Sequence, residues 1–218
     1  MNTQKCSAKI LILTTALWLG LSGFGLWVLL KYQAAPGVSD LPPIAWPKES
    51  AIPKIHGLAT LLLIAHPECP CTAASIEELA WIMSRTPNKA RVHVLFFKPA
   101  AFPKDWEKGS LWSKAEAIPG VNVYCDVDGV EAKHFNVGTS GHAILYDGQG
   151  HLLFSGGITR ARGHSGSNAG RDAIVALLTR GHAEYRRTNV FGCSLLNISN
   201  QRKNIWNLKD FIGMIPNR

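Results

Sequence analysis

The chain has 218 residues, 46% of them hydrophobic, and a formal net charge of +8 at pH 7. A chain of this length can form a membrane segment and one globular domain with a proper core, but two full domains would be crowded. The positive charges are spread along the sequence rather than stacked into one stripe. This distribution fits anionic lipid headgroups or an anionic ligand better than nucleic acid.

The first predicted element is an uncharged apolar run over residues 10–30. At ~1.5 Å per residue, a helix of this length covers about 31 Å, roughly the hydrocarbon thickness of a bilayer. A cleaved signal peptide is the alternative, but the run is long for one, and residues 31–35 offer no clean small-x-small cleavage site. We therefore predict a transmembrane helix over 10–30 that acts as an uncleaved signal-anchor.

The lysines on the two sides of this helix predict its orientation. Lys5 and Lys9 precede the apolar run, and Lys31 follows it. Because positive charges favour the cytoplasmic side, the balance places residues 1–9 in the cytoplasm. The predicted location is the bacterial inner membrane, crossed once, with the globular domain in the periplasm, where disulfide bonds form and persist.

The elements after the membrane helix begin with a proline-rich stretch over 31–54, which indicates a stiff, extended spacer. Strands are then predicted at 58–65, 91–97, 121–125, 142–147 and 151–155, and helices at 72–85, 110–117, 129–135 and 169–180. Gly148 and Gly150 indicate a hairpin between the last two strands. This order predicts an α/β domain over 55–181 with a mixed sheet flanked by helices. Residues 182–218 form a tail to which the pattern assigns no firm structure.

The chemistry-bearing point of the chain is the junction between the first strand and the helix after it. Cys69 and Cys71 lie there on either side of Pro70. A cysteine at the first turn of a helix faces unpaired backbone N–H groups and the positive end of the helix dipole, which favour thiolate over thiol. The sequence therefore predicts a redox-active or metal-handling thiol site.

This order of elements, with a cysteine motif at the start of the helix after the first core strand, resembles the thioredoxin fold over roughly residues 55–181. The segment VGTSGHAILYD at 137–147 is similar to membrane-anchored thioredoxin-like reductases. The phrases HPECPCTAAS and SGGITRARGHSGSNAG resemble the RedB group of thioredoxin-like proteins. The RedB resemblance implies a fold rather than an established reaction.

Two departures from the family pattern bear on the chemistry. The family motif is C-x-x-C, whereas here one residue separates the cysteines and Glu68 takes the place of the first one. A disulfide closed across one residue is strained, and strain makes it more easily reduced. The family's cis-proline, which borders the thiols and helps to dock substrate, corresponds to Gly141, preceded by Ser140. We expect Ser140 and Gly141 to contact substrate, and the missing proline leaves room for a metal or another ligand.

The glycine-rich loop over 156–170 is predicted to border the cysteines, because the last strand runs back towards the end of the sheet that carries them. Arg160 and Arg162 in this loop are suited to an anionic group near the N-terminus of the following helix, and we expect them to bind substrate. His164 is predicted to exchange a proton with Cys69, since a histidine has an ordinary pKa of about 6.5.

Other side chains have plainer predicted roles. We expect His66, Trp81 and Cys125 to be packed, Asn168 to cap the last helix, and Ser75, Glu77 and Glu78 to lie on a solvated helix surface. Cys193 is predicted as a packed thiol, with a resolving or metal-ligand role as the alternative.

Two functions from different classes follow from these residues. The first is a thiol-disulfide oxidoreductase without a cofactor, acting on protein or small-molecule thiols and disulfides. In it Cys69 attacks, Cys71 resolves and His164 assists proton transfer. The alternative is a metallochaperone in which Cys69, Cys71 and either Cys193 or a histidine such as His164 hold Cu(I) or Zn.

Overall fold

The computed structural model describes residues 2–37 and 41–195, with side chains from residue 9 onward. The chain divides into two compact units, residues 1–35 and residues 36–218. Residues 38–40 of the predicted spacer and residues 196–218 of the predicted tail lie outside the described residues.

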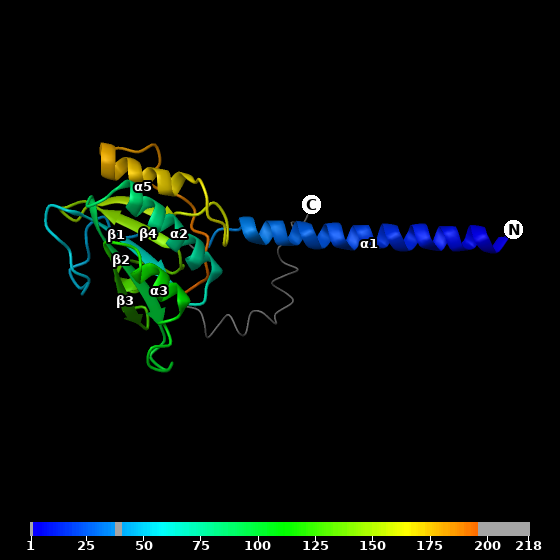
Figure 1. Ribbon diagram of the computed structural model, residues 1–218, viewed down its shortest axis with the longest axis horizontal. Coiled ribbons are helices and arrows are strands. Elements are labelled where there is room, and N and C mark those ends of the chain that lie inside the picture. The colour runs from blue at the N-terminus through cyan, green and yellow to red at the C-terminus, as the bar shows by residue number, and fades with distance from the viewer. Residues whose placement is uncertain (1, 38–40, 196–218) are drawn as a thin grey trace. The chain divides into compact units, whose positions relative to one another are not determined.

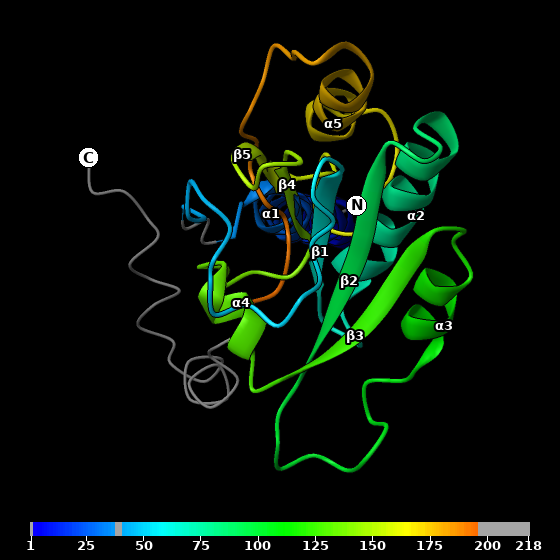
Figure 2. The same ribbon diagram turned by 90° about the vertical axis from the view of Figure 1, so that its left-hand side faces the viewer.

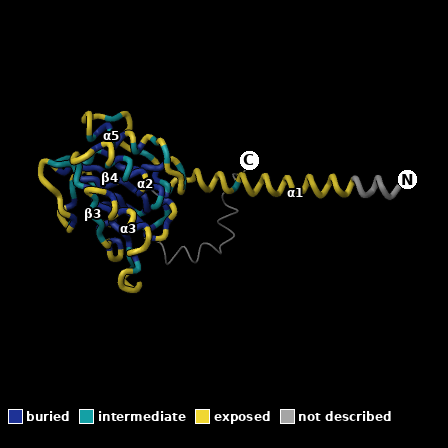
Figure 3. The backbone as a smooth tube through the Cα atoms, in the orientation of Figure 1, coloured by how far each residue is buried: buried dark blue, intermediate teal, exposed yellow. Residues whose placement is uncertain are grey.

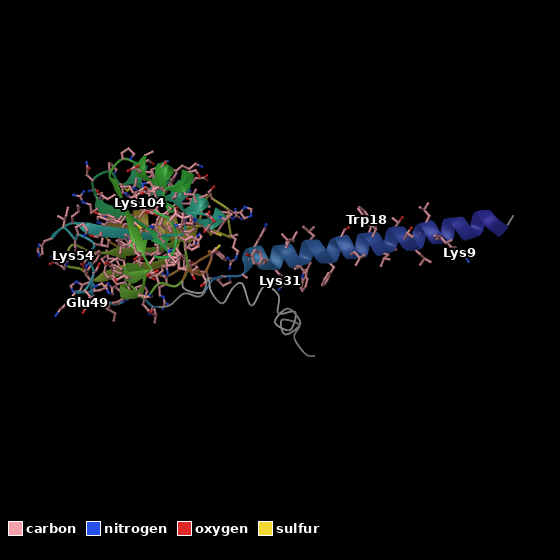
Figure 4. The ribbon with its side chains drawn as sticks, turned by 90° about the horizontal axis from the view of Figure 1, so that it is seen from below. Lys9, Trp18, Lys31, Glu49, Lys54 and Lys104 are labelled. Atoms are coloured by element: carbon pink, nitrogen blue, oxygen red, sulfur yellow. The ribbon has the colours of Figure 1, made fainter. Side chains whose placement is uncertain are left out.

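The first unit is a single helix, α1 (Asn2–Ala34). Its part from Lys9 to Ala34 is long and apolar enough to cross a membrane, with a mean hydropathy of 1.7 over its most apolar window. Figure 4 shows Lys9 and Lys31 towards the two ends of this helix and Trp18 between them. The helix begins before the predicted 10–30 span and extends beyond it. Its apolar side chains are exposed, which is typical of a helix whose solvent is lipid.

The second unit is built on one five-stranded mixed sheet, in the order β3-β2-β1-β4-β5 (Figure 1). The strands are β1 (Ala59–Ala65), β2 (Ala90–Lys98), β3 (Val121–Val127), β4 (His142–Tyr146) and β5 (Leu152–Gly157). β1 pairs parallel with β2, and β2 with β3. β4 pairs antiparallel with β1 and with β5, so β5 runs in the same direction as β1. The predicted hairpin between β4 and β5 is confirmed.

Helices cover both faces of this sheet. They are α2 (Pro70–Arg85), α3 (Ser110–Glu116), α4 (Val130–His134) and α5 (Ala169–Arg180). Figure 2 shows α4 on one side of the sheet and α2 and α3 on the other. All the predicted strands and helices of this unit are present, with ends displaced by at most two residues. The expectation of a mixed sheet flanked by helices is therefore confirmed.

The core lies on the two faces of the sheet, because successive side chains of a strand point to opposite faces. Leu61 and Leu63 of β1 pack under α2, α3 and α5, whereas Leu62 and Ile64 face the side of α4. All four are fully buried, as expected for the central strand of a sheet covered on both faces. Figure 3 shows the buried residues gathered inside this unit.

Residues on both sides of the predicted 55–181 domain contribute to the same core. Trp46, in the predicted spacer, packs against Phe135 and Tyr146 with ring centroids 5.0 and 5.2 Å apart. Ile52 and, near the other end, Leu195 belong to the same cluster. This part of the proline-rich stretch is therefore packed against the domain and is not a free spacer.

Cys125 was expected to be packed, and this prediction is wrong. It lies in β3, an edge strand of the sheet, and its side chain is exposed. The apolar pattern of the segment places a strand there but does not show that the strand is at the edge.

Candidate thiol site

The site lies at the edge of the sheet where β1 and β5 end and β4 begins. Ile64 of β1 lies opposite His142 of β4, which in turn lies opposite Gly157 of β5. Cys69 follows β1 after a short turn and is the N-cap of α2, with Pro70 as the first helical residue. Proline is favoured at that position because its missing N–H is not needed there. The strand-turn-helix arrangement thus places the Cys69 sulfur at the N-terminus of α2.

A cysteine from the far end of the described chain lies against Cys69. The Sγ atoms of Cys69 and Cys193 are 2.9 Å apart, although 124 positions separate the two residues in sequence. The Cys71 thiol lies close enough to both of them to affect their pKa values. The site is therefore a cluster of three thiols, not only the C-x-C pair.

Cys193 is carried by residues 186–195, which we call the C-terminal segment. Its first part runs beside β5, where the Arg186 carbonyl accepts from the Ser155 N–H at 3.1 Å. Its last part pairs with the turn before β4: Thr139 and Ser194 form an antiparallel bridge, and the Leu195 N–H donates to the Gly138 carbonyl at 2.8 Å. The segment is therefore held against β5 and the turn before β4 by isolated bridges and backbone hydrogen bonds.

Ser140 connects this segment to the thiols. Its N–H donates to the Cys193 carbonyl at 2.8 Å, and its Oγ accepts from the Cys193 N–H at 3.0 Å. Its hydroxyl also donates to the Cys69 sulfur at 3.4 Å. The structure thus places Ser140, predicted to contact substrate, directly between Cys69 and the backbone of Cys193.

The negative charge of the cluster is concentrated on Cys69. Its pKa is lowered far below the ordinary value, chiefly by the hydrogen bond with Cys193 and next by that with Cys71. The pKa of Cys193 is raised in turn, because its hydrogen bond with Cys69 keeps its proton in place. Three thiols in contact cannot all ionise, and the charge is most stable on the sulfur that accepts the most hydrogen bonds. The pKa directions therefore favour Cys69 as the sulfur that carries the negative charge.

Cys69 and Cys71 are poorly accessible in this arrangement. Their relative exposures are 2% and 4%. Cys193 is only partly buried and lies on the outer side of the cluster. A substrate can reach the Cys69 sulfur only if the residues that bury it, Cys193 among them, move away.

The loop over 156–170 contacts both the thiols and the C-terminal segment. The Gly163 backbone hydrogen-bonds Cys71, and Arg162 Nη1 donates to the Gly192 carbonyl at 2.6 Å. Arg160 and His164 are exposed, and within residues 41–195 neither side chain makes a hydrogen bond or ion pair. The structure brings Arg162 to the site, whereas the roles predicted for Arg160 and His164 stay predictions.

Glu78 was expected on a solvated helix surface, and this prediction is wrong. Its exposure is 3%, and its Oε2 lies 3.0 Å from Arg171 Nη1. Its other oxygen accepts the Gly166 N–H. Arg171 also lies over the Trp81 ring, 3.9 Å from the centroid. Glu78 thus joins α2 to α5 and to the loop beside the thiols.

Two more predictions concern Asn168 and Ser75. Asn168 caps α5 as predicted, since its Oδ1 accepts from the Arg171 N–H at 2.8 Å. Ser75, also expected at the surface, is buried, and its hydroxyl donates to the Cys71 carbonyl at 3.0 Å. Polar residues of α2 thus face the protein at two positions: Ser75 lies beside Gly141, and Glu78 lies against the loop and α5.

Gly141 occupies a position that few other residues tolerate. Its φ is +79°, and a Cβ would lie 2.9 Å from the Ser75 hydroxyl. Its N–H donates to the Ile64 carbonyl at 2.7 Å, which ends the pairing of β4 with β1. Gly141 therefore fixes the turn that presents Ser140 to the thiols, and its direct contact with substrate stays a prediction.

His66 is packed, as predicted. Its ring stacks on Phe97 with centroids 6.3 Å apart and meets Trp106 edge-on at 5.9 Å. Its N–H donates to the Thr72 hydroxyl at 3.1 Å. His66 therefore orders the turn before Cys69.

A second buried histidine lies close to the site. The Nε2 of His142, at the start of β4, is 2.8 Å from the Ser155 hydroxyl. Burial, and then the charge of Arg187, lowers the pKa of His142 to about 4. Both partners line a cavity of about 240 Å³, together with Gly156, Arg187, Thr188 and Asn189.

The low pKa of His142 predicts a stability that depends on pH. Its ordinary value is 6.5, so between about pH 6.5 and pH 4 the unfolded chain binds a proton there that the folded chain does not. We expect the free energy of unfolding to fall as pH decreases through this window, by up to ~3 kcal/mol from this group. Urea unfolding of the full chain in detergent, compared with His142→Gln, measures it: the variant should show the shallower slope. Equal slopes would contradict the assignment.

The thiol cluster does not have the spacing of a zinc site. Two sulfurs that bind one tetrahedral Zn²⁺ at about 2.3 Å lie roughly 3.8 Å from each other. The Cys69–Cys193 separation of 2.9 Å is shorter. Within the part of the chain that the structure describes, no group of three His, Cys, Asp or Glu side chains is arranged to hold a metal ion.

Solved structures share the architecture of this chain at low sequence identity. A hypothetical protein from Sinorhizobium meliloti is 17% identical, with a TM-score of 0.57 over 74% of this chain and 96% of that one. An uncharacterized conserved protein from Geobacillus kaustophilus is 17% identical, with a TM-score of 0.54 over 75% and 89%. A secreted Mycobacterium tuberculosis disulfide oxidoreductase is 16% identical, with a TM-score of 0.42 over 58% and 84%. No family model and no curated protein matches the chain.

The chain has a thioredoxin-like fold. Its mixed sheet β3-β2-β1-β4-β5 is flanked by helices, and its cysteines lie at the N-terminus of the helix that follows β1. At 17% identity the similar structures share this architecture and assign no activity to the chain.

Proposed function

We propose that this protein is a membrane-anchored thiol-disulfide oxidoreductase. The observation that carries the proposal is the Cys69 sulfur at the N-terminus of α2, in hydrogen-bonding contact with a second thiol 2.9 Å away. The first property supplies a stabilised thiolate, and the second supplies a thiol that can release a bound substrate. A buried inert cysteine has neither property.

In the proposed reaction Cys69 attacks one sulfur of a substrate disulfide, and a neighbouring thiol resolves the mixed disulfide. The sequence predicts Cys71 as the resolving thiol. Ser140 and Arg162 are proposed to contact the substrate, because they surround the cluster. Gly141, Arg160 and His164 keep the substrate-binding and proton-transfer roles that the sequence suggests for them.

The proposed location follows from α1. Its apolar stretch of 26 residues supports a single membrane crossing as a signal-anchor. The lysine balance supports a domain on the periplasmic side of a bacterial inner membrane, where dithiols can cycle through disulfides. We also propose that the chain is related to the RedB group, on the two phrases around Cys69 and Gly163.

The proposal is tested by turnover of the full chain in detergent micelles. The reduced protein is mixed with a peptide disulfide and glutathione, and the released peptide thiol is followed over time. We expect thiol release in proportion to protein concentration, with the protein losing two hydrogens in intact mass when glutathione is omitted. No release above the background of glutathione would contradict the proposal.

The alternative, a metallochaperone for Cu(I) or Zn that uses the same thiols, rests on the chemistry of their sulfur atoms and requires them to rearrange around the ion. Soft thiolates select these ions. Native mass spectrometry of the same sample decides between the two: a bound ion with all thiols reduced would favour the metallochaperone, and a two-hydrogen loss without an ion the enzyme.

A further inference from the structure

We propose that Cys193, and not Cys71, is the redox partner of Cys69, and that the C-terminal segment (186–195) delivers it to the site. This inference rests on the proposed thiol-disulfide exchange and names the second thiol of that reaction. The C-x-C spacing suggests the opposite, since it makes Cys71 the nearest cysteine in sequence.

The short distance between the Cys69 and Cys193 sulfurs favours Cys193 as the redox partner. Its sulfur lies 2.9 Å from that of Cys69, closer than two sulfurs without a bond usually approach. A disulfide between Cys69 and Cys71 must close across one residue, Pro70, and such a ring is strained. Cys193 comes from a separate segment and can meet Cys69 without that restriction. A link between the two therefore needs only a small movement of the sulfurs.

The backbone around Cys193 is held as a bound peptide would be. Ser140 makes two hydrogen bonds with the Cys193 main chain, one through its N–H and one through its Oγ. Arg162 holds the Gly192 carbonyl from the other side. The segment thus lies beside Ser140 and presents Cys193 to Cys69, as a bound substrate peptide would present its own cysteine.

The reaction balances with a substrate disulfide as the oxidant. The Cys69 thiolate attacks one substrate sulfur; a Cys69–substrate disulfide forms, and the first substrate thiolate leaves and takes a proton from solvent. Cys193 loses its proton to solvent and attacks the Cys69 sulfur; the Cys69–Cys193 disulfide forms, and the second substrate thiolate leaves. The substrate disulfide is reduced to two thiols, and the two protein thiols are oxidised to one disulfide.

The same contacts make the segment a competitor of the substrate. Cys69 is 2% exposed while Cys193 lies against it. The first attack therefore requires the segment to move away from Ser140, and its return brings the resolving thiol. The C-terminal segment thus performs both steps: it uncovers Cys69, and it supplies the thiol that resolves the mixed disulfide.

Peptide mapping of the oxidised full chain tests which thiols pair. Trypsin cleaves after Lys54, Arg85, Arg187 and Arg202, so Cys69 and Cys71 fall in one peptide and Cys193 in another. We expect a cross-link between peptides 55–85 and 188–202 after a single turnover with a peptide disulfide. Fragmentation before Pro70 separates the two cysteines and should place the link on Cys69. The cross-link should persist in Cys71→Ser.

The rate at which Cys193→Ser releases the second substrate thiol tests the same pairing. This variant should accumulate the Cys69–substrate mixed disulfide and release the second thiol roughly 100-fold or more slowly, because the intramolecular thiol is replaced by dilute thiols in solution. Cys125→Ser is the matched control, since Cys125 is exposed on the edge strand β3. It should release both thiols at the wild-type rate.

The outcomes separate this inference from the proposed function. A disulfide within peptide 55–85, with normal release by Cys193→Ser, would overturn the role of Cys193 and leave the oxidoreductase intact. Absence of both turnover and disulfide in the wild type would overturn the proposed function and this inference together.

A glycine in the segment gives an independent test that leaves all three thiols in place. A Cβ at Gly192 would overlap the Ser140 carbonyl, so Gly192→Ala should displace the segment. We expect alkylation of Cys69 by iodoacetamide to be roughly tenfold faster or more, as expected for ~1.4 kcal/mol lost from the closed arrangement. Gly109→Ala is the control, because no atom lies within 4 Å of a Cβ there. Unchanged alkylation in Gly192→Ala would show that the segment does not cover Cys69.

Discussion

Replacement of Cys69 by serine is expected to abolish thiol-disulfide exchange, with a loss of at least ~1,000-fold in turnover of a peptide disulfide. The reason is that Cys69 alone in the cluster combines the helix N-terminus with hydrogen bonds from the other thiols, so it carries the thiolate. A serine hydroxyl has nearly the same volume and can keep the same hydrogen bonds, but it is not ionised near neutral pH. The change therefore removes the nucleophile with little disturbance of the packing.

The measurement is the rate of peptide thiol release by the full chain at equal protein concentration. The free energy of unfolding of Cys69→Ser, measured in urea, should stay close to that of the wild type and so separate a loss of chemistry from a loss of fold. Cys125→Ser should retain the wild-type rate. If Cys69→Ser releases thiol as fast as the wild type, the nucleophile lies elsewhere and the proposed mechanism is wrong.

Replacement of Glu78 by alanine is expected to destabilise the domain by about 3–5 kcal/mol. The change removes the buried carboxylate that pairs with the Arg171 guanidinium, whose side chain is 12% exposed. Arg171 then keeps the exposed carboxylate of Asp172, 3.3 Å from its Nε. The change also removes the acceptor of the Gly166 N–H. Because a largely buried charge loses its buried partner, the cost exceeds that of a surface substitution.

Glu77 provides a control one residue away on the same helix. Its side chain is exposed, so Glu77→Ala should change the free energy of unfolding by no more than ~0.5 kcal/mol. Urea unfolding of both variants, in the full chain in detergent, gives the comparison. Equal stability of the two variants would mean that the Glu78–Arg171 pair makes no net contribution to the fold.

The Glu78 pair also bears on the thiol site. It joins α2, which carries the two cysteines of the C-x-C motif, to the loop from which Arg162 reaches the C-terminal segment. Loss of the pair is therefore expected to loosen the same contacts that hold Cys193 against Cys69. Faster alkylation of Cys69 in Glu78→Ala than in Glu77→Ala, under conditions in which both are folded, would show this connection.

Ser140 and Gly141 differ from the pattern that the resemblance places beside the thiols. The sequence shows only that Ser140 and Gly141 stand where the resemblance places a substrate-docking proline. In the structure Gly141 allows the turn, with φ of +79°, and Ser140 binds the main chain of Cys193. The chain's own C-terminal segment therefore binds at the position where the resemblance places the docking proline.

The elements and their order can be predicted from the sequence, because they depend on residues close together in the chain. The apolar run at 58–65 predicts a strand, the Cys69-Pro70-Cys71 junction precedes a helix predicted from residue 72, and Asn168 predicts the cap of the last helix. The glycines after Asp147 gave the hairpin. Each of these signals acts through a hydrogen bond or a side-chain period within a few positions, so it is visible without the fold.

Which cysteines meet and which polar residues are buried depends on the fold of the whole domain. Cys193 reaches Cys69 across 124 positions, and Glu78 finds Arg171 across 93. Neither partner can be identified from local periodicity, because a buried carboxylate and an exposed one occupy the same kind of position on a helix. The sequence predicted a reactive thiol at the start of α2, and the folded sheet, by bringing the end of β5 and the C-terminal segment to that point, supplied its partner.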